Sequence, residues 1–253
     1  MDLGLRGKRA IITGGTRGIG LAISKLLAGE GCDVAICARN HTAVDETVAY
    51  LARSGVRATG GTVDVADLAS LRGWIDEAAG ALGGLDIFVA NVSAIAQGMD
   101  EAAWRRGFEI DVMGTVFGTE AALPHLEQSE AGSIVIIGST AMAEINGPTR
   151  SYAAVKAALL PYVKGLARNL AAKNVRANMV SPGNVYFTGG VWDNVRQQNP
   201  DMFATMLGRN PMGRMGTPEE VANAVVFLAS PRASFITGTN LIIDGALTQR
   251  VQF

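Results

Sequence analysis

Tyr152 and Lys156 stand four positions apart in the segment SYAAVKAALL, whose remaining residues are mostly small or apolar. Residues at i and i+4 share one face of an α-helix, so a helix here would place the phenol beside the ammonium. A neighbouring positive charge favours the ionised form of a phenol. The pair therefore predicts a tyrosine that exchanges a proton with an alcohol or a carbonyl compound near neutral pH.

Ser139 is the next candidate for chemistry, because it directly follows the apolar run SIVIIG at 133–138. In open α/β sheets the carboxyl ends of the strands face the crevice where ligands bind. We therefore expect the serine hydroxyl to hydrogen-bond a substrate oxygen. A tyrosine and a lysine at this spacing are, on their own, often only a helix surface. The serine and a glycine loop favour an active site.

The glycine loop, TGGTRGIG at 13–20, joins the apolar run RAIIT (9–13) to a segment with helical periodicity (20–31). Glycine permits a tight turn and a close approach of the backbone to a ligand. Free N–H groups and the positive dipole end of a helix suit a pyrophosphate. This context predicts dinucleotide binding rather than a purely structural turn. The cofactor contacts expected in the loop are Gly14, Thr16, Arg17, Gly18, Ile19 and Gly20.

The choice of dinucleotide depends on the end of the second apolar run, DVAICARN. A carboxylate at this point would hydrogen-bond the 2′-hydroxyl of NAD, and none is present. Ala38 and Arg39 stand there instead, and Arg17 in the glycine loop is expected near the same ribose. Two guanidinium groups without a carboxylate suit a 2′-phosphate, so the sequence favours NADP(H) over NAD(H).

The elements that position these residues follow from an alternation of short apolar runs with longer segments of helical periodicity. Nearly uninterrupted apolar strands indicate a parallel sheet covered on both faces. We expect an α/β single-domain Rossmann fold over 1–253, with a doubly wound seven-stranded parallel sheet. A helix at 218–230 is expected to begin with Thr217 as its cap and Pro218 in its first turn. The expected strands are 9–13, 33–37, 56–63, 86–90, 133–138, 175–180 and 239–244.

The composition excludes several function classes. The chain has 253 residues, 48% of them hydrophobic, and a formal net charge of −1, which argues against nucleic-acid or membrane-surface binding. Cys32 and Cys37 are too few for a disulfide framework, so we interpret them as reduced core residues. His41 and His125 lack the spacing of metal ligands, and no metal is expected. No run approaches a membrane span, and the expected location is cytoplasmic.

The loop TGGTRGIG and the segment YAAVK resemble the short-chain dehydrogenase/reductase family, and its 3-oxoacyl-carrier-protein reductase-like members most closely. SPG at 181–183 and ITGTNLIIDGA near the end extend the resemblance over nearly the whole chain. It implies that Ser139 polarises the substrate oxygen, that Tyr152 is the acid/base, and that Lys156 holds the nicotinamide ribose and supports the phenolate. Further implied cofactor contacts are Asp64 and Val65 at the adenine, Thr188 at the carboxamide despite a slightly long spacing, and Asn91, Pro182, Gly183 and Val185.

Two residues depart from the family's pattern. The family's NNAG reads ANVS here, which keeps Asn91 and replaces the glycine with Ser93. A serine there could narrow or re-polarise the pocket near the nicotinamide. The segment FEIDVMGT places Asp111 where the family usually has an asparagine that holds a water behind the lysine. We expect Asp111 to accept from that water and also to pair with Lys156.

The segment 184–216, a long connection without an expected strand, occupies the place of the family's substrate lid. Its many large apolar residues indicate a hydrophobic pocket, although some of them are equally explained as residues that pack the segment against the core. We expect a small hydrophobic ketone or secondary alcohol as substrate. A carrier-bound substrate is disfavoured, because the chain lacks a dense basic patch for an acidic carrier protein. The residues expected to line the pocket are Ser93, Ile95, Met142, Tyr186 and Trp192.

The leading hypothesis is an NADP(H)-dependent oxidoreductase, and alternatives stay open. The family resemblance allows a 3-oxoacyl-thioester reductase, and Asp111 suggests an enoyl- or dienoyl-thioester reductase, which the intact Ser-Tyr-Lys set disfavours. A non-catalytic dinucleotide-binding regulatory protein would not need that set. The resemblance also implies a homotetramer, paired through helices near 101–127 and 150–173 and through the C-terminal end. The residues expected at these interfaces are Gly114, Ala153, Ala157, Ala158, Leu247, Val251 and Phe253.

Overall fold

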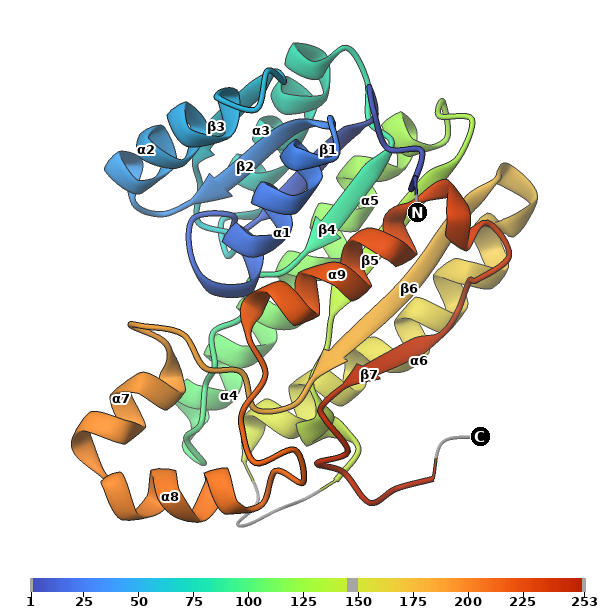
Figure 1. Cartoon of the computed structure of the whole chain (residues 1–253). Helices are drawn as coiled ribbons and strands as arrows, with labels where there is room; N and C mark the ends of the chain where they lie inside the picture. The colour runs from blue at the N-terminus through green and yellow to red at the C-terminus, as the bar shows by residue number, and fades with distance from the viewer. Residues whose placement is uncertain (1, 145–149, 252–253) are drawn as a thin grey trace.

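A seven-stranded, all-parallel sheet forms the centre of the computed structural model, which describes residues 2–144 and 150–251 (Figure 1). The strand order is β3-β2-β1-β4-β5-β6-β7, so the chain winds outward in both directions from β1 and β4. The predicted single-domain, doubly wound fold is confirmed. The strands are β1 (Arg9–Thr13), β2 (Asp33–Ala38), β3 (Ala58–Thr62), β4 (Ile87–Ala90), β5 (Gly132–Ile137), β6 (Val175–Pro182) and β7 (Asn240–Ile243).

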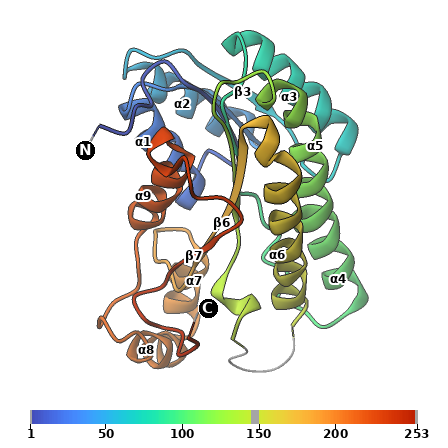
Figure 2. The same cartoon turned by 90° about the vertical axis from the view of Figure 1, so that its right-hand side faces the viewer.

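Helices cover both faces of the sheet (Figure 2). One hydrophobic core lies under α3, α5 and α6 and includes Phe88, and a second lies under α1, α2 and α9 and includes Ile12. β4 and β5 are buried along their whole length, which explains why their sequences show no polar alternation. The helices are α1 (Gly18–Gly29), α2 (His41–Ala52), α3 (Leu68–Leu82), α4 (Glu101–Gly107), α5 (Gly114–Leu126), α6 (Ser151–Leu170), α7 (Val191–Gln198), α8 (Pro200–Gly208) and α9 (Pro218–Ala229).

The start of α9 confirms the predicted cap. The Thr217 hydroxyl accepts from the backbone N–H of Glu220 at 3.4 Å, and the Glu220 carboxylate accepts from the Thr217 N–H at 2.9 Å. Each side chain thus satisfies a backbone donor of the other residue, as in a capping box. The first helix differs slightly from the prediction, since it begins at Gly18 rather than Gly20.

Segment 184–216 contains two helices, α7 and α8, which lie beyond the carboxyl ends of the strands (Figure 1). A single parallel bridge between Val185 and Gly216 ties the two ends of the segment together. As predicted, the structure assigns no strand to this segment. The segment predicted as a lid is therefore a pair of helices anchored at its base.

Three sequence expectations concern packing. Cys32 and Cys37 are both free and buried, as predicted, and burial raises the pKa of each thiol to about 12, so neither is a ready nucleophile. Gly114, which the sequence analysis expected at a subunit interface, packs inside the chain instead. It is buried, and a Cβ built on it would lie 3.2 Å from Val65. Phe253 lies outside the described residues.

Within the described residues, no helix combines the length and apolarity needed to cross a lipid bilayer.

Candidate active site

The carboxyl-terminal edge of the sheet collects the residues singled out for chemistry. Ser139 follows β5, and Tyr152 and Lys156 lie in the first turns of α6. The start of α6 is fixed to the loop after β4, because the Ser151 hydroxyl contacts the carbonyl oxygens of Ala96 and Gly98 at 2.8 and 3.1 Å. The sequence analysis did not single out Ser151.

Lys156 is almost completely buried, with 3% of its side chain exposed. Its Nζ donates to the carbonyl oxygen of Ile137, the last residue of β5, at 2.9 Å. The same atom lies 3.0 Å from Oδ1 of Asp111, whose side chain is only 1% exposed. The predicted pairing of Asp111 with Lys156 is confirmed as a direct ion pair. An ammonium has three donors, so Lys156 keeps the capacity to donate to a further acceptor beside Ile137 and Asp111.

Asp111 lies in a π-helical turn, Phe108–Met113, inserted between α4 and α5. Its Oδ2 accepts from the Ala94 N–H at 2.8 Å, which ties the turn to the loop carrying Ser93. Its Oδ1 is buried and has no hydrogen bond of good geometry, although it contacts the Lys156 ammonium. Single π turns are rare in proteins as a whole, but those that occur often lie at functional sites. The periodicity of the sequence did not indicate this turn.

Tyr152 and Ser139 both keep a hydroxyl proton available. The Ser139 oxygen accepts from the Ala141 N–H at 3.2 Å and caps the short 3₁₀ helix Thr140–Met142. Tyr152 is partly buried. Within residues 2–144 and 150–251, neither hydroxyl donates a hydrogen bond. Two uncommitted donors at one edge of the sheet can both serve a substrate oxygen.

The glycine loop has the backbone geometry that a dinucleotide phosphate needs. Gly14 and Gly18 have φ values of +71° and +53°, a region that other residues rarely adopt. A Cβ on Gly20 would collide with the carbonyl oxygen of Gly14. Asn91 holds the loop from the end of β4, because its Nδ2 donates to the carbonyl oxygens of Thr13 and Gly14 at 3.0 and 3.1 Å. Its amide therefore shapes the loop.

The residues at the adenosine end fit a 2′-phosphate. Arg17 and Arg39 are exposed, and neither pairs with a carboxylate among the residues that the structure describes. Ala38 ends β2, so no acidic side chain occupies that position. Asp64 is exposed and accepts from the Ala66 N–H at 3.1 Å. Val65 is buried. Two guanidiniums and a glycine cradle together fit a phosphorylated dinucleotide.

The remaining predicted cofactor contacts line the base of the lid. Thr188 is exposed on a cleft of about 370 Å³ that also borders the glycine loop. Val185 is 9% exposed and bridges to Gly216. Thr16 borders the same cleft, whereas the other members of the predicted set lie in the adjoining helix, strand and loop. These are Ile19 in α1, Pro182 at the end of β6, and Gly183.

The predicted substrate residues are distributed over three segments. Ser93 accepts from the Ile95 N–H at 3.1 Å, and Ile95 has a φ of +47° with 37% of its surface exposed. Met142 packs against the core under α3, α5 and α6. Tyr186 and Trp192 are partly buried in the lid. Their contact with a substrate stays a prediction.

A second cleft, of about 230 Å³, lies under the lid and is lined by Tyr186, Phe203, Leu207 and Met215 among others. Neither this cleft nor the one beside the glycine loop includes Tyr152 or Ser139 in its lining. The assignment of Tyr152 and Ser139 as reacting residues therefore rests on their chemistry and their place at the edge of the sheet, and it stays a prediction.

Comparison with known proteins gives a consistent family match. Residues 14–248 match the family model described as enoyl-(acyl carrier protein) reductase. The chain is 39% identical to the isoepoxydon dehydrogenase patN of Penicillium expansum, over 100% of this chain and 99% of that protein. It is 32% identical to a 3-oxoacyl-[acyl-carrier-protein] reductase of Escherichia coli, over 97% and 99% of the two chains.

Solved structures show the same likeness. A short-chain dehydrogenase from Burkholderia cenocepacia J2315 in complex with NADP superposes with a TM-score of 0.86 at 33% identity, covering 96% of this chain and 99% of that one. A 7α-hydroxysteroid dehydrogenase complexed with NADH and 7-oxo glycochenodeoxycholic acid gives a TM-score of 0.90 at 32% identity, covering 99% and 98%. The resemblance seen in the sequence is confirmed.

Proposed function

The chain belongs to the short-chain dehydrogenase/reductase family, and we propose that it is an NADP(H)-dependent oxidoreductase that interconverts a hydrophobic ketone and a secondary alcohol. The observation that carries the proposal is the buried ion pair of Lys156 and Asp111 behind Tyr152. Burying two charges is costly unless they are paired. The pair fixes Lys156 one helical turn from Tyr152, where its ammonium can stabilise the charge that develops on the phenol oxygen during proton transfer.

The chain's own residues move the proton. In reduction, the hydroxyls of Ser139 and Tyr152 bind the carbonyl oxygen, and Tyr152 gives it a proton as the oxygen becomes an alkoxide. Lys156 stabilises the resulting phenolate, and Asp111 together with the Ile137 carbonyl holds Lys156 in place. In oxidation the phenolate accepts the alcohol's proton. When bound, the nicotinamide supplies or accepts the hydride.

Arg17 and Arg39 support the choice of NADP(H). The solved relatives include complexes with NADP and with NADH, so the preference of this chain depends on its own residues. Two exposed guanidiniums without a carboxylate partner suit the 2′-phosphate, and Ala38 leaves no carboxylate to repel it. Gly14, Gly18 and Gly20 would hold the pyrophosphate.

The apolar lid supports a hydrophobic substrate. Segment 184–216 would cover the reacting carbonyl as a substrate lid, with Tyr186 and Trp192 facing the substrate. Named relatives act on isoepoxydon or bind a 7-oxo bile acid. A thioester reductase is the second candidate, because the family model and the Escherichia coli relative are named for carrier-protein thioesters.

Absorbance of the reduced nicotinamide, followed over a panel of hydrophobic ketones, a 3-oxoacyl thioester and an enoyl thioester, tests the proposal. We expect oxidation of NADPH with a ketone from the panel and slower oxidation with either thioester. Turnover of the enoyl thioester alone would favour the second candidate. Binding of NADPH with no turnover of any carbonyl compound would favour a regulatory dinucleotide-binding protein.

We also propose a homotetramer. Trp104 and Phe108 on α4 and its π turn, and Leu160 on α6, are 41%, 49% and 40% exposed. Large apolar side chains in this number on neighbouring helices are typical of a surface that another subunit covers. Light scattering at micromolar concentration should give the mass of four chains, and a monomer would contradict the proposal.

A further inference from the structure

Asp193, in the first turn of α7, gathers hydrogen bonds from the strand-to-helix connection that precedes it. Its Oδ1 accepts from the Tyr186 hydroxyl at 2.7 Å. Its Oδ2 accepts from the Gly189 N–H at 2.8 Å and from the Gln197 side chain at 3.2 Å. The residue is 8% exposed. Both carboxylate oxygens therefore accept hydrogen bonds, and the donors come from residues before and after Asp193 in the sequence.

The connection between these donors, Tyr186–Gly190, is a closed turn. The Gly190 N–H donates to the Phe187 carbonyl oxygen at 3.0 Å, and Gly189 adopts a φ of +75°. The Tyr186 hydroxyl also accepts from Arg196 at 3.1 Å, so it acts as both donor and acceptor within the segment. The turn is therefore held at its start and near its end by one carboxylate.

The Phe187 ring, carried by this turn, lies directly on the glycine loop. A Cβ on Gly18 would be 2.6 Å from the ring, and one on Gly190 would be 2.8 Å from it. Only glycine at both positions allows the ring to lie where it does. Phe187 and Thr188 form one wall of the cleft of about 370 Å³, and Thr16, Arg17 and Gly18 form another.

We propose that Asp193 is a positioning residue, a latch that holds the Tyr186–Gly190 turn closed with the Phe187 ring over the dinucleotide-binding loop and thereby slows release of the cofactor. The inference rests on the proposed function for the identity of the ligand, whereas the latch itself is a contact within the chain. Capping of α7 does not account for these contacts. An acidic residue at the third position of a helix would accept from the N–H of the N-cap, here Gly190, and that N–H donates to Phe187 instead, whereas Asp193 accepts from Gly189 and Tyr186.

The electrostatics of the latch suit a neutral solution. The pKa of Asp193 lies below its usual range despite partial desolvation. The main cause is the hydrogen bond from the Gly189 N–H, followed by the one from the Tyr186 hydroxyl. The hydrogen bond from Gln197 and the charge of Arg196 act in the same direction. Among the residues that the structure describes, the side chains of Tyr186 and Gln197 donate to this carboxylate, and Arg196 donates to the Tyr186 hydroxyl. The carboxylate therefore stays charged, and the latch closed, throughout the neutral range.

Hydrogen exchange in the cofactor-free protein tests the latch without reference to function. Asp193→Asn removes the charge and one acceptor, so amide exchange in 186–190 should rise about tenfold. Tyr186→Phe, which keeps the ring, should raise it less in the same segment. Asp201→Asn is the matched control, an exposed aspartate in the first turn of α8. Unchanged exchange in both latch variants, or an equal rise in the control, would overturn the latch.

Stopped-flow release of NADPH tests the consequence. Asp193→Asn should release NADPH about tenfold faster with a smaller change in its association rate, and the control should match the wild type. An unchanged release rate beside faster exchange would overturn the role of the latch in cofactor retention. If the wild type binds no NADPH, the proposed function fails, and the exchange measurement still decides whether Asp193 closes the turn.

Discussion

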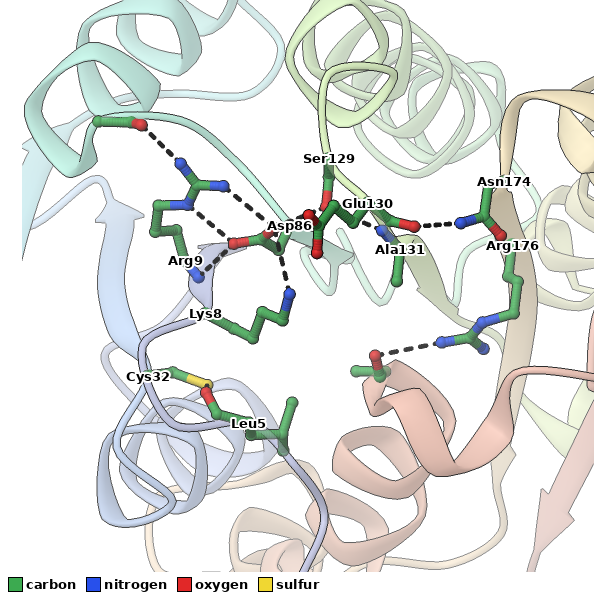
Figure 3. Close-up of polar contacts among 12 residues, drawn as sticks. Leu5, Lys8, Arg9, Cys32, Asp86, Ser129, Glu130, Ala131, Asn174 and Arg176 are labelled. Atoms are coloured by element: carbon green, nitrogen blue, oxygen red, sulfur yellow. Dashed lines mark hydrogen bonds and ion pairs between the residues drawn. The ribbon is translucent and has the colours of Figure 1, made fainter.

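The two edges of the sheet each bury an ion pair, and the carboxylates in them are partnered to different extents. At the amino-terminal edge, Asp86 meets donors on both oxygens (Figure 3). At the carboxyl-terminal edge, Asp111 contacts Lys156 but keeps an oxygen without a hydrogen bond of good geometry. The carboxylate at the amino-terminal edge is thus saturated with donors, and the carboxylate at the carboxyl-terminal edge keeps unused hydrogen-bonding capacity.

The hydrogen bonds at the amino-terminal edge centre on Arg9. Its Nε and backbone N–H donate to Asp86 Oδ2 at 2.8 and 2.9 Å, and its Nη2 donates to Oδ1 at 3.1 Å. Ser129 adds a hydrogen bond to Oδ1 at 2.6 Å (Figure 3). Arg176 on β6 donates to the carbonyl oxygens of Leu228 and Ala229, the last residues of α9. These contacts join strand starts to helix ends and leave no acceptor on Asp86 for a ligand.

The hydrogen bonds around Asp86 also change the pKa of its carboxyl group. Burial on its own would raise the pKa of Asp86, but hydrogen bonds from Arg9 and Ser129 outweigh it and hold that pKa below its usual range. A carboxyl whose folded-state pKa is lowered contributes stability above its unfolded-state pKa of about 4 and loses it as the pH falls further. The amino-terminal edge should therefore control acid unfolding.

Tyr152→Phe should give the largest effect and leave stability untouched. The change removes the proton donor and keeps the ring, and general acid/base catalysis contributes about 10²- to 10⁴-fold. We expect kcat to fall by that factor, while the NADPH dissociation constant and the melting temperature stay near those of the wild type. Steady-state kinetics, cofactor titration and thermal denaturation measure the three quantities.

The matched control is Tyr162→Phe, on the same helix. The Tyr162 hydroxyl donates to the Val116 carbonyl oxygen at 3.4 Å, and burial raises its pKa to about 12, so it is no acid/base at neutral pH. This variant should keep full activity. Near-normal turnover in Tyr152→Phe, or equal losses in both variants, would refute the proposed role of Tyr152.

Asp86→Ala should give the opposite result, with reduced stability and normal catalysis per folded molecule. Removing one partner of a buried pair leaves the other unpaired, and we expect a loss of about 3 kcal/mol in the free energy of unfolding. Urea denaturation measures it. The difference from the wild type should shrink between pH 7 and pH 3, because the native Asp86 loses its own contribution in acid.

Asp76→Ala provides the surface control for that measurement. Asp76 pairs with His125 at 2.8 Å, but 66% of its side chain is exposed. Exposed pairs contribute about 1 kcal/mol or less. If Asp86→Ala cost no more than Asp76→Ala, the amino-terminal cluster would not be the stabilising element that its hydrogen bonds indicate.

The sequence predicted one edge better than the other for physical reasons. Glycines, the Tyr-x-x-x-Lys spacing and Ser139 are local patterns, so the candidate residues of the carboxyl-terminal edge could be named before the fold was known. The Arg9–Asp86 pair joins residues 77 positions apart, and no local pattern announces it. It required the strand order, which brings the starts of β1 and β4 side by side.

The features that sequence reasoning missed within the site are also non-local or geometric. The π turn around Asp111 changes the helix register without a proline or another breaking residue in FEIDVM. Asp193 looks like an ordinary acidic residue in a helix's first turn, and only the folded lid brings Tyr186 and Gly189 to its carboxylate. The fold class followed from the alternation of short runs with helical segments, although β3, with the sequence ATGGT, is not itself an apolar run.

Arg39→Ala and Arg17→Ala should have an intermediate effect confined to one cofactor. Loss of a charge-assisted hydrogen bond to the 2′-phosphate should raise the NADPH Michaelis constant about 10- to 100-fold. NADH, which lacks the phosphate, should be used as before or slightly better. Adding Ala38→Asp should shift the preference further toward NADH. Equal weakening of both cofactors, or a wild-type preference for NADH, would contradict our reading of these arginines.

Asp111→Asn should have the smallest effect, and it tests whether the charge of the carboxyl-terminal pair matters beyond its shape. Asparagine keeps an oxygen that can face Lys156 or accept from Ala94, so the turn should stay folded. Without the carboxylate, the Lys156 charge acts on Tyr152 unopposed and favours the phenolate more strongly. The basic-form limb of the pH profile for alcohol oxidation should therefore move to lower pH. Asp45→Asn, which changes an exposed aspartate, should leave the profile unmoved. A shift to higher pH, or a collapse of NADPH binding, would mean that Asp111 acts through packing, and the contrast between the two edges would then lie in geometry alone.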